Sequence, residues 1–217
     1  VGLLNALHAL RGDRVSAGQL AEEAAHVEMD VLQRPIGKQD HYAAAFGGLN
    51  YLSFLKDGRV TIEPQRLPPD ILSEMFDHLM LYWTGLKRDA ASILTQQRAN
   101  IPGRTEQLLG IRDQAGKLRE SIGNGFHPEH LGGVLDAGWQ LKRQLANGIT
   151  NENIDVWYQK AKEAGAVGGK LCGAGGGGFL LFVVPPQRKK SVQDALSDVA
   201  EIPIGYEAQG SRVMIAE

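Results

Sequence analysis

The spacing of apolar residues predicts that much of the chain is helical. In an amphipathic helix apolar residues recur every three to four positions, because those positions share one face. The first ten residues show this spacing through Leu3, Leu4, Leu7 and Leu10. Further helices are predicted at residues 16–32, 89–100, 105–121, 128–147, 152–164 and 187–199, with one or two helical turns before Gly48.

The predicted helix that begins near Ser16 carries recognisable start and stop signals. Ser16 and Gln19 have the spacing of a capping box, and Val15 and Leu20 have that of a hydrophobic staple. Pro35 follows the predicted end, and the residue before a proline disfavours helical backbone. We therefore predict one continuous helix between these signals.

Short apolar segments without helical spacing predict strands. Residues 49–55 and 59–64 flank Lys56-Asp57-Gly58 and are expected to pair as a hairpin. The other predicted strands are 79–83, 179–184, 202–208 and 212–216. The prolines between positions 64 and 69 indicate a domain boundary. The pattern thus predicts an α+β chain with domains at 1–65 and 66–217.

Composition narrows the class of protein. The 217 residues are 43% hydrophobic and 22% charged, with a formal net charge of −2, so neither nucleic acid nor a membrane is expected as a partner. Apolar runs stay below the ~18 residues of a membrane span, and Arg11, Asp13 and Arg14 interrupt the first one, which argues against a signal peptide. A single cysteine, Cys172, excludes a disulfide framework. We expect a cytoplasmic protein, with a homo-oligomer left open.

The beginning of the chain is unusual. There is no Met, and Val1 already lies in the helical pattern without a preceding Ser, Thr, Asp or Asn cap. This predicts that the sequence starts inside a helix of a longer protein.

Glycine is concentrated in one segment. Of 27 glycines, eight lie among the fourteen positions from Gly165 to Gly178. Glycine permits positive φ and close approach, and successive N–H groups can then bind phosphate. The segment follows a helix and precedes a strand, the reverse of a dinucleotide-binding loop, and it lacks the Gly-Lys-Ser/Thr of a Walker A loop. A phosphate loop and a tightly packed turn without a ligand both stay open.

Two carboxylates are candidates for chemistry. Asp40 lies at the start of a short helix, two residues after Lys38. It could face a substrate hydroxyl, with the lysine lowering its pKa and stabilising a transferring phosphate; a helix-capping aspartate is the alternative. Glu28 lies on a helical stripe of small residues, where a carboxylate is expected to meet a cation or a partner. The alternative is an ordinary boundary position on an amphipathic helix.

Lys87 and Arg88 form a basic turn between a predicted strand and a helix, just after Thr84-Gly85. Free N–H groups at the start of a helix favour anions, so two cations there could hold one. A solvated basic turn is the alternative.

Several of these segments resemble the GHMP kinases, the superfamily of galactokinase, homoserine kinase, mevalonate kinase and phosphomevalonate kinase. The stretch LCGAGGGGF at 171–179 is similar to that family's C-terminal glycine motif. The stretch PIGKQDHYAAAFGGLN at 35–50 resembles the heptose 7-phosphate kinase branch, and so do 82–88, 138–142 and 168–171. The resemblance covers nearly the whole chain and keeps the order of the motifs.

The resemblance implies the two-domain α+β fold of these kinases. Residues 1–65 would complete a truncated N-terminal domain, and 66–217 would form a ferredoxin-like C-terminal domain with additional helices. It also implies ATP and Mg²⁺ as cofactors. The family's Gly/Ser-rich ATP loop precedes the helix where this chain starts, so the chain by itself is expected to be inactive.

The resemblance also implies roles at matching positions. Asp40 takes the place of the catalytic aspartate, Glu28 that of the Mg²⁺-binding glutamate, and Lys38 and Lys170 are neighbours of phosphate. His41 departs from the Gln that is frequent in this branch. The loop that supports the nucleotide phosphates would comprise Gly173, Gly175, Gly176, Gly177 and Gly178.

The implied reaction is ATP-dependent phosphorylation of the anomeric hydroxyl of a sugar phosphate, D-glycero-D-manno-heptose 7-phosphate. Lys87 and Arg88 would then bind the distal phosphate of this small-molecule substrate. Two alternatives stay open: another sugar 1-kinase of galactokinase or fucokinase type, and a non-catalytic sensor on the same fold.

Overall fold

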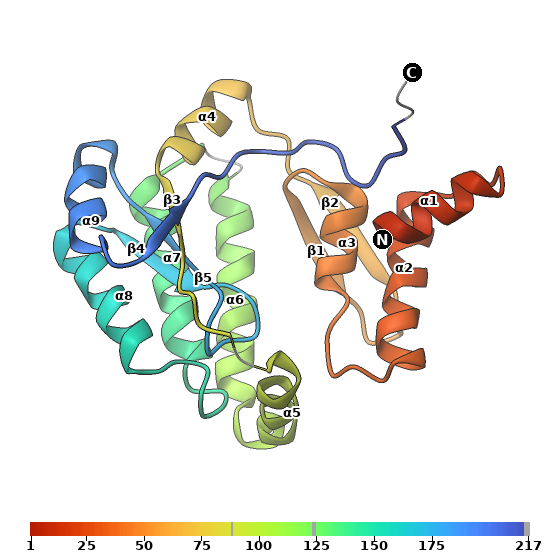
Figure 1. Cartoon of the computed structure of the whole chain (residues 1–217), viewed down its shortest axis with the longest axis horizontal. Coiled ribbons are helices and arrows are strands. Elements are labelled where there is room, and N and C mark those ends of the chain that lie inside the picture. The colour runs from red at the N-terminus through yellow and green to blue at the C-terminus, as the bar shows by residue number, and fades with distance from the viewer. Residues whose placement is uncertain (88, 123–124, 215–217) are drawn as a thin grey trace. The chain divides into compact units, whose positions relative to one another are not determined.

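A computed structural model describes residues 1–87, 89–122 and 125–214 (Figure 1). The chain forms two compact units, which we describe separately. The first unit contains residues 1–66 and 206–217, and the second contains residues 67–205. The expected domain of 66–217 therefore differs from the observed second unit at its C-terminal end.

Helices and one β-hairpin form the first unit. Strands β1 and β2 are antiparallel, with Leu52 opposite Ile62, and Gly58 turns the chain between them with φ of +86°. The predicted hairpin is confirmed. The elements are α1 (Gly2–Leu10), α2 (Ala17–His26), the π-helical turn η1 (Val27–Val31), α3 (Gln39–Phe46), β1 (Asn50–Phe54) and β2 (Val60–Pro64).

The C-terminal segment joins the first unit through backbone hydrogen bonds. The amide of Ser211 donates to the carbonyl of Ala44, on α3, at 2.9 Å. The amide of Gly48 donates to the carbonyl of Glu207 at 2.8 Å. These bonds satisfy polar groups at the end of α3 that would otherwise need water or a cap.

The start of α2 uses half of the predicted capping box. Ser16 is the N-cap, and its hydroxyl accepts a hydrogen bond from the amide of Gln19 at 3.1 Å. The side chain of Gln19 donates to Glu23 at 2.7 Å instead of returning to the cap. The staple residues Val15 and Leu20 belong to the same apolar cluster, as the spacing predicted.

The predicted continuous helix to residue 32 is interrupted. The α-helix ends at His26 and the chain continues as the π-helical turn η1. A π turn inserts an extra residue and rotates the side chains that follow it, and such turns are frequent at functional sites. Glu28 lies within this turn, so its direction does not follow the α-helical stripe on which the sequence placed it.

The second unit is built on a four-stranded antiparallel sheet (Figure 1). The strands are β3 (Leu79–Trp83), β4 (Gly168–Leu171), β5 (Phe179–Val183) and β6 (Ala200–Ile202). Their spatial order is β4-β5-β3-β6. In chain order this is 2-3-1-4, the arrangement of a ferredoxin-like sheet. The resemblance implied this architecture correctly.

Helices lie in two of the connections between the strands of the second unit. Between β3 and β4 the chain forms several helices, and α9 connects β5 to β6. The core contains Trp139, Tyr82 and Phe182, each about 1% exposed or less. The helices are α4 (Pro69–Asp77), α5 (Ala90–Asn100), η2 (Ile101–Gly103), α6 (Thr105–Ile122), α7 (Pro128–Lys142), α8 (Glu152–Ala164), η3 (Pro186–Arg188) and α9 (Lys189–Ala195).

The last predicted strands are wrong or untested. The strand expected at 202–208 is instead β6, which ends at Ile202. Pro203 follows it and lacks the N–H that a further ladder bond would need. Residues 212–214 are not in a strand, and the remainder of the strand predicted at 212–216 lies outside the described residues.

Strand β4 was not predicted, because its first two residues are glycines. A Cβ on Gly168 would lie 2.0 Å from the carbonyl oxygen of Gly132, and one on Gly169 would lie 2.4 Å from that of Leu181. Both glycines are therefore packing requirements: one lets α7 approach β4, and the other lets β5 approach it.

Candidate functional site

The glycine loop connects two antiparallel strands. It runs from residue 172 to 178 between β4 and β5, and the amide of Cys172 donates to the carbonyl of Phe179 at 2.8 Å to close it. The φ angles are positive at four glycines, where an L side chain would be strained. These are Gly173 (+80°), Gly175 (+119°), Gly176 (+74°) and Gly178 (+99°).

Part of the loop's glycine content is explained by packing. A Cβ on Gly177 would lie 2.3 Å from the carbonyl oxygen of Leu86, and one on Gly175 would lie 2.8 Å from the Cα of Ile149. The amide of Gly176 donates to the carbonyl of Ile149 at 2.8 Å. The tightly packed turn thus accounts for these positions. Gly173 is different, since nothing lies within 4 Å of its Cβ direction.

Three consecutive N–H groups of the loop have no acceptor among the described residues. Within the described parts of the chain, no acceptor is found for the amides of Gly173, Ala174 and Gly175. Residues that alternate between positive and negative φ can point successive amides at one anion. These amides are therefore available to donate hydrogen bonds to a phosphate group.

An open hollow of about 280 Å³ borders the loop at Gly176. Gly176 and Lys87 line it, together with the start of α8. Asn151 caps that helix by accepting from the amide of Ile154 at 3.1 Å. The hollow is polar and wide open to solvent, and it is lined by Leu86, Lys87, Asn151, Glu152, Asn153 and Gly176.

The basic turn is only partly described. Arg88 lies outside the described residues, so the structure does not test its predicted role. Lys87 is exposed and lines the hollow beside Gly176. Helix α5 begins after Asp89, whose carboxylate accepts from the amide of Ala91 at 3.0 Å. A carboxylate already caps this helix start, which weakens the expectation that free N–H groups there hold an anion.

Lys142 was given no role from the sequence, yet its ammonium group lies against the glycine loop. It is the last residue of α7 and donates a hydrogen bond to the carbonyl of Gly173. Burial, followed by the nearby charge of Lys170, lowers the pKa of Lys142 to about 8. Burial also raises the pKa of the Cys172 thiol, although both lysines oppose that shift. The sequence contained only an indirect signal, since Lys142 ends one of the stretches that carried the resemblance.

Asp40 lies in the first turn of α3, in the first unit. It is exposed, and in the described portion of the chain no hydrogen bond or ion pair involves its side chain. The helix has Lys38 as N-cap without a side-chain cap bond, so Asp40 is not a helix cap. A free carboxylate at this position is available to a substrate hydroxyl.

Lys38 is not paired with Asp40. Its ammonium group lies 2.8 Å from one carboxylate oxygen of Glu22, and the other oxygen accepts from the hydroxyl of Tyr42. These two hydrogen bonds lower the pKa of Glu22. Burial, with the bond to Glu22 adding to it, raises the pKa of Tyr42 to about 12. Lys38 lines a hollow of about 510 Å³ beside α2. Because it pairs with Glu22 in this arrangement, it does not act on the Asp40 carboxylate.

The carboxylate of Glu28 contacts one side chain on each of its oxygens. Arg34 donates to one carboxylate oxygen at 3.1 Å, and the Nε2 atom of His41 lies 2.8 Å from the other. His41 is buried, and Glu28 is about 35% exposed on its side chain. The described residues contain no cluster of three or more His, Cys, Asp or Glu side chains for a metal. A carboxylate oxygen has two lone pairs, so Glu28 can still provide one ligand to a Mg²⁺ ion that phosphate and water otherwise coordinate.

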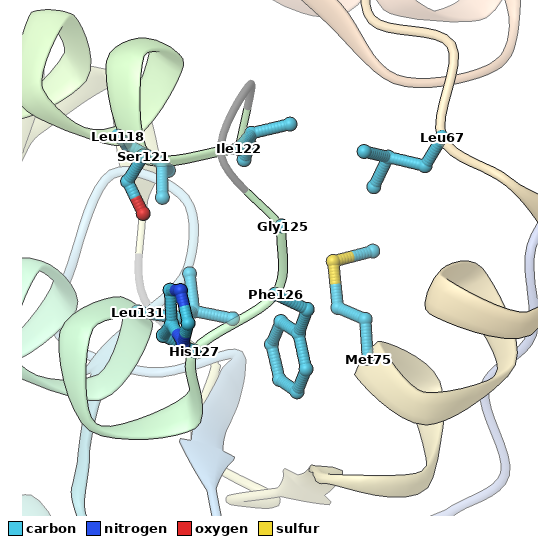
Figure 2. A pocket seen from close by; sticks show the side chains of 9 residues that line it. All are labelled: Leu67, Met75, Leu118, Ser121, Ile122, Gly125, Phe126, His127 and Leu131. Atoms are coloured by element: carbon cyan, nitrogen blue, oxygen red, sulfur yellow. The ribbon is translucent and has the colours of Figure 1, made fainter.

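A further hollow in the second unit is too small to be a substrate site (Figure 2). It measures about 20 Å³, room for little more than one water molecule. Figure 2 shows Met75 and Phe126 facing it from different segments. Its lining is mostly apolar and comprises Leu67, Met75, Leu118, Ser121, Ile122, Gly125, Phe126, His127 and Leu131.

Among the described helices, none has the length and apolar character to cross a bilayer.

The second unit matches a known family. Residues 127–202, which include α7, β4, the glycine loop and β6, match the family of GHMP kinases, C terminal. The D-glycero-alpha-D-manno-heptose 7-phosphate kinase of Campylobacter jejuni is 30% identical over 161 residues, covering 72% of this chain and 47% of that protein. The galactokinase of Pyrococcus furiosus is 26% identical over 223 residues, covering 89% of this chain and 60% of that protein.

Solved structures agree with this match. A D-glycero-D-manno-heptose 1-phosphate kinase from Bacteroides thetaiotaomicron has a TM-score of 0.73 at 26% identity, covering 95% of this chain and 58% of that one. Galactokinase from Lactococcus lactis shares the fold, with a TM-score of 0.70 at 16% identity over 96% of this chain and 64% of its own. The chain spans about half the length of the heptose kinases it matches. With the ferredoxin-like sheet and its glycine loop, these findings show that the chain belongs to the GHMP kinase superfamily.

Proposed function

We propose that the protein containing this chain is an ATP-dependent kinase that phosphorylates the anomeric hydroxyl of D-glycero-D-manno-heptose 7-phosphate. The observation that carries the proposal is the glycine loop, with its free amides, in a chain 30% identical to a heptose 7-phosphate kinase. Phosphoryl transfer requires mainly positioning and neutralisation of charge. The chain offers candidates for each of these tasks.

In the proposed mechanism, ATP bound with Mg²⁺ supplies the phosphoryl group. Asp40 accepts the proton of the attacking hydroxyl or orients it, because its carboxylate is exposed and unpaired within the described residues. Glu28 would provide a carboxylate ligand to the ion. Arg34 and His41 hold that carboxylate from two sides, which fixes its direction.

The second unit would contribute the phosphate contacts. The loop from Gly173 to Gly178 supports the nucleotide phosphates through its backbone. Lys87 and Arg88 are proposed to bind the phosphate already present on the sugar; Lys87 is exposed beside the loop. Lys38 is proposed to act near the transferring group only after it leaves Glu22.

A second candidate is another sugar 1-kinase, which the galactokinase similarity favours. A substrate panel separates the two. With the protein containing this chain, we expect kcat/KM for the heptose 7-phosphate to exceed that for galactose, fucose and unphosphorylated heptose by at least about 10-fold. Preference for galactose or fucose would replace the heptose assignment, and turnover of none of these sugars would favour a non-catalytic sensor.

Glu28→Gln should weaken the response to metal. The amide is nearly isosteric but neutral, so it is a poorer ligand for a hard cation. We expect the Mg²⁺ concentration for half-maximal rate to rise by roughly 10-fold, in line with loss of a metal contact. Glu23→Gln, on α2 and paired with His8, is the control. Equal Mg²⁺ dependence of the parent and Glu28→Gln enzymes would remove Glu28 from the metal site.

A further inference from the structure

The chain that follows β6 lies against the end of α3. Residues 206–212, the C-terminal segment, are in neither a helix nor a strand, yet they belong to the first unit and pass beside α3 (Figure 1). The segment contacts α3 through two backbone hydrogen bonds, from the amide of Gly48 to the carbonyl of Glu207 and from the amide of Ser211 to the carbonyl of Ala44.

Glycines allow this contact from both sides. At the end of α3, Gly47 has φ of +64°, and a Cβ there would lie 2.2 Å from the carbonyl carbon of Gln209. On the C-terminal segment, a Cβ on Gly210 would lie 2.0 Å from the carbonyl oxygen of Ala45. Each overlap involves backbone atoms, which no side-chain rotation can move. The two backbones are therefore in direct contact, and a side chain at either glycine would separate them.

Helix α3 is too short to hold its own position. It has eight residues, and its N-cap Lys38 makes no side-chain cap bond. Helices of this length are not stable alone in water, so tertiary contacts decide where α3 lies. Tyr42 and Ala45 pack it into the apolar cluster that contains Leu20. Apolar packing is non-directional, whereas hydrogen bonds and steric fit at the helix end fix its position along its axis.

The anchored end of α3 is one helical turn from Asp40, the proposed proton acceptor. Ala44, whose carbonyl accepts from Ser211, lies four residues after Asp40. In an α-helix the amide of a residue donates to the carbonyl four positions earlier, so a shift at Ala44 is transmitted to Asp40. Misplacement of a reacting group by ~1 Å can lower a rate about 10²-fold.

We propose that the C-terminal segment is a positioning element for α3, and that Gly210 and Ser211 are its positioning residues. The segment fixes the helix end through its backbone and acts on the reaction only through Asp40. Its effect on the rate rests on the proposed function. Its effect on α3 requires no substrate, so the two can fail separately.

The first test is hydrogen exchange, measured by mass spectrometry on peptides covering 43–49 and 206–212 of the protein containing this chain. In Gly210→Ala, the new Cβ should push the segment away, and the amides of Gly48 and Ser211 then lose their acceptors. We expect these peptides to exchange at least about 10-fold faster, with the β1–β2 hairpin unchanged. Parent-like exchange of both peptides would overturn the proposal.

Gly205→Ala is the matched control. Gly205 lies five residues before Gly210, is exposed, and has nothing within 4 Å of its Cβ direction. Its alanine variant should exchange and turn over substrate as the parent does. A change in Gly205→Ala as large as in Gly210→Ala would mean that the effect does not arise from the contact with α3.

The second test is a kinetic cycle with Asp40→Asn. Gly210→Ala alone should lower kcat by roughly 10-fold or more. Added to Asp40→Asn, it should change kcat by less than about two-fold, because residues that act through one another are not additive. A simple loss of folded enzyme would instead lower kcat by the same factor in both backgrounds, and that result would overturn the positioning role.

A second pair of variants keeps the test valid if Gly210→Ala does not fold. Ser211→Pro removes the amide that donates to Ala44, whereas Ser211→Ala keeps it. The proline variant should reproduce both effects expected for Gly210→Ala, and the alanine variant should keep kcat within about two-fold of the parent. Equal kcat for the two Ser211 variants would overturn the role of this bond. Failure of the proposed function would appear differently, as absence of turnover in the parent protein itself.

Discussion

In the protein containing this chain, replacing Asp40 with Asn should lower kcat by about 10²-fold or more, with little change in KM for either substrate. A positioned proton acceptor contributes on the order of 10²–10⁴ to a rate. Asparagine keeps the shape of the side chain but cannot accept the proton. Because Asp40 is exposed and forms no bond with a described residue, the substitution should not disturb folding.

Asp70 provides a matched control for this prediction. It is the second residue of α4 and exposed, as Asp40 is the second residue of α3. Asp70→Asn should therefore leave kcat within about two-fold of the parent value, since surface substitutions away from special features have small effects. An equal kcat for Asp40→Asn and the parent enzyme would mean that Asp40 is only a surface residue of the first turn.

Gly168→Ala should destabilise the second unit severely. The new Cβ would lie 2.0 Å from the carbonyl oxygen of Gly132 and 2.5 Å from its carbonyl carbon. Both are backbone atoms, so α7 or β4 must move as a whole. Overpacking costs typically ~1–3 kcal/mol and sometimes more, and this overlap is extreme, so we expect at least about 3 kcal/mol. Urea unfolding monitored by circular dichroism measures the change.

The control for this prediction is the glycine next to the contact. Gly133 lies on α7 beside Gly132, it is exposed, and nothing lies within 4 Å of its Cβ direction. Alanine is favoured over glycine in a helix by up to about 1 kcal/mol. Gly133→Ala should therefore leave the chain equally or more stable. Similar unfolding midpoints for the two alanine variants would contradict the close approach of α7 and β4.

Much of the fold was predictable because local signals agreed with the final structure. Helical spacing located α5, α6 and α8 to within a residue or two, and the Lys56-Asp57-Gly58 turn located the hairpin. Signals failed where tertiary contacts decide the backbone. Strand β4 begins with two glycines that only its neighbours require, and α4 lies in a proline-rich segment that indicated a boundary. The π-helical turn at Val27–Val31 leaves no spacing signal of its own.

The side-chain pairings around the candidate site residues could not be predicted from the sequence. Glu28 pairs with Arg34 and contacts His41 from within the π-helical turn, which removes it from the stripe of small residues on which the sequence placed it. Proximity in sequence suggested that Lys38 acts on Asp40, but Lys38 pairs with Glu22, sixteen residues away. Lys142 reaches the carbonyl of Gly173 only because α7 packs along β4, a contact that no local pattern specifies.

The most direct test of the central claim is the position of the phosphate that the enzyme adds. The protein containing this chain is incubated with ATP, Mg²⁺ and D-glycero-D-manno-heptose 7-phosphate, and the product is examined by ³¹P–¹H correlation NMR. We predict a second phosphorus signal coupled to the anomeric proton, with the original phosphate still on carbon 7. A new phosphate on any other carbon, or ATP consumption without a phosphorylated product, would contradict the account.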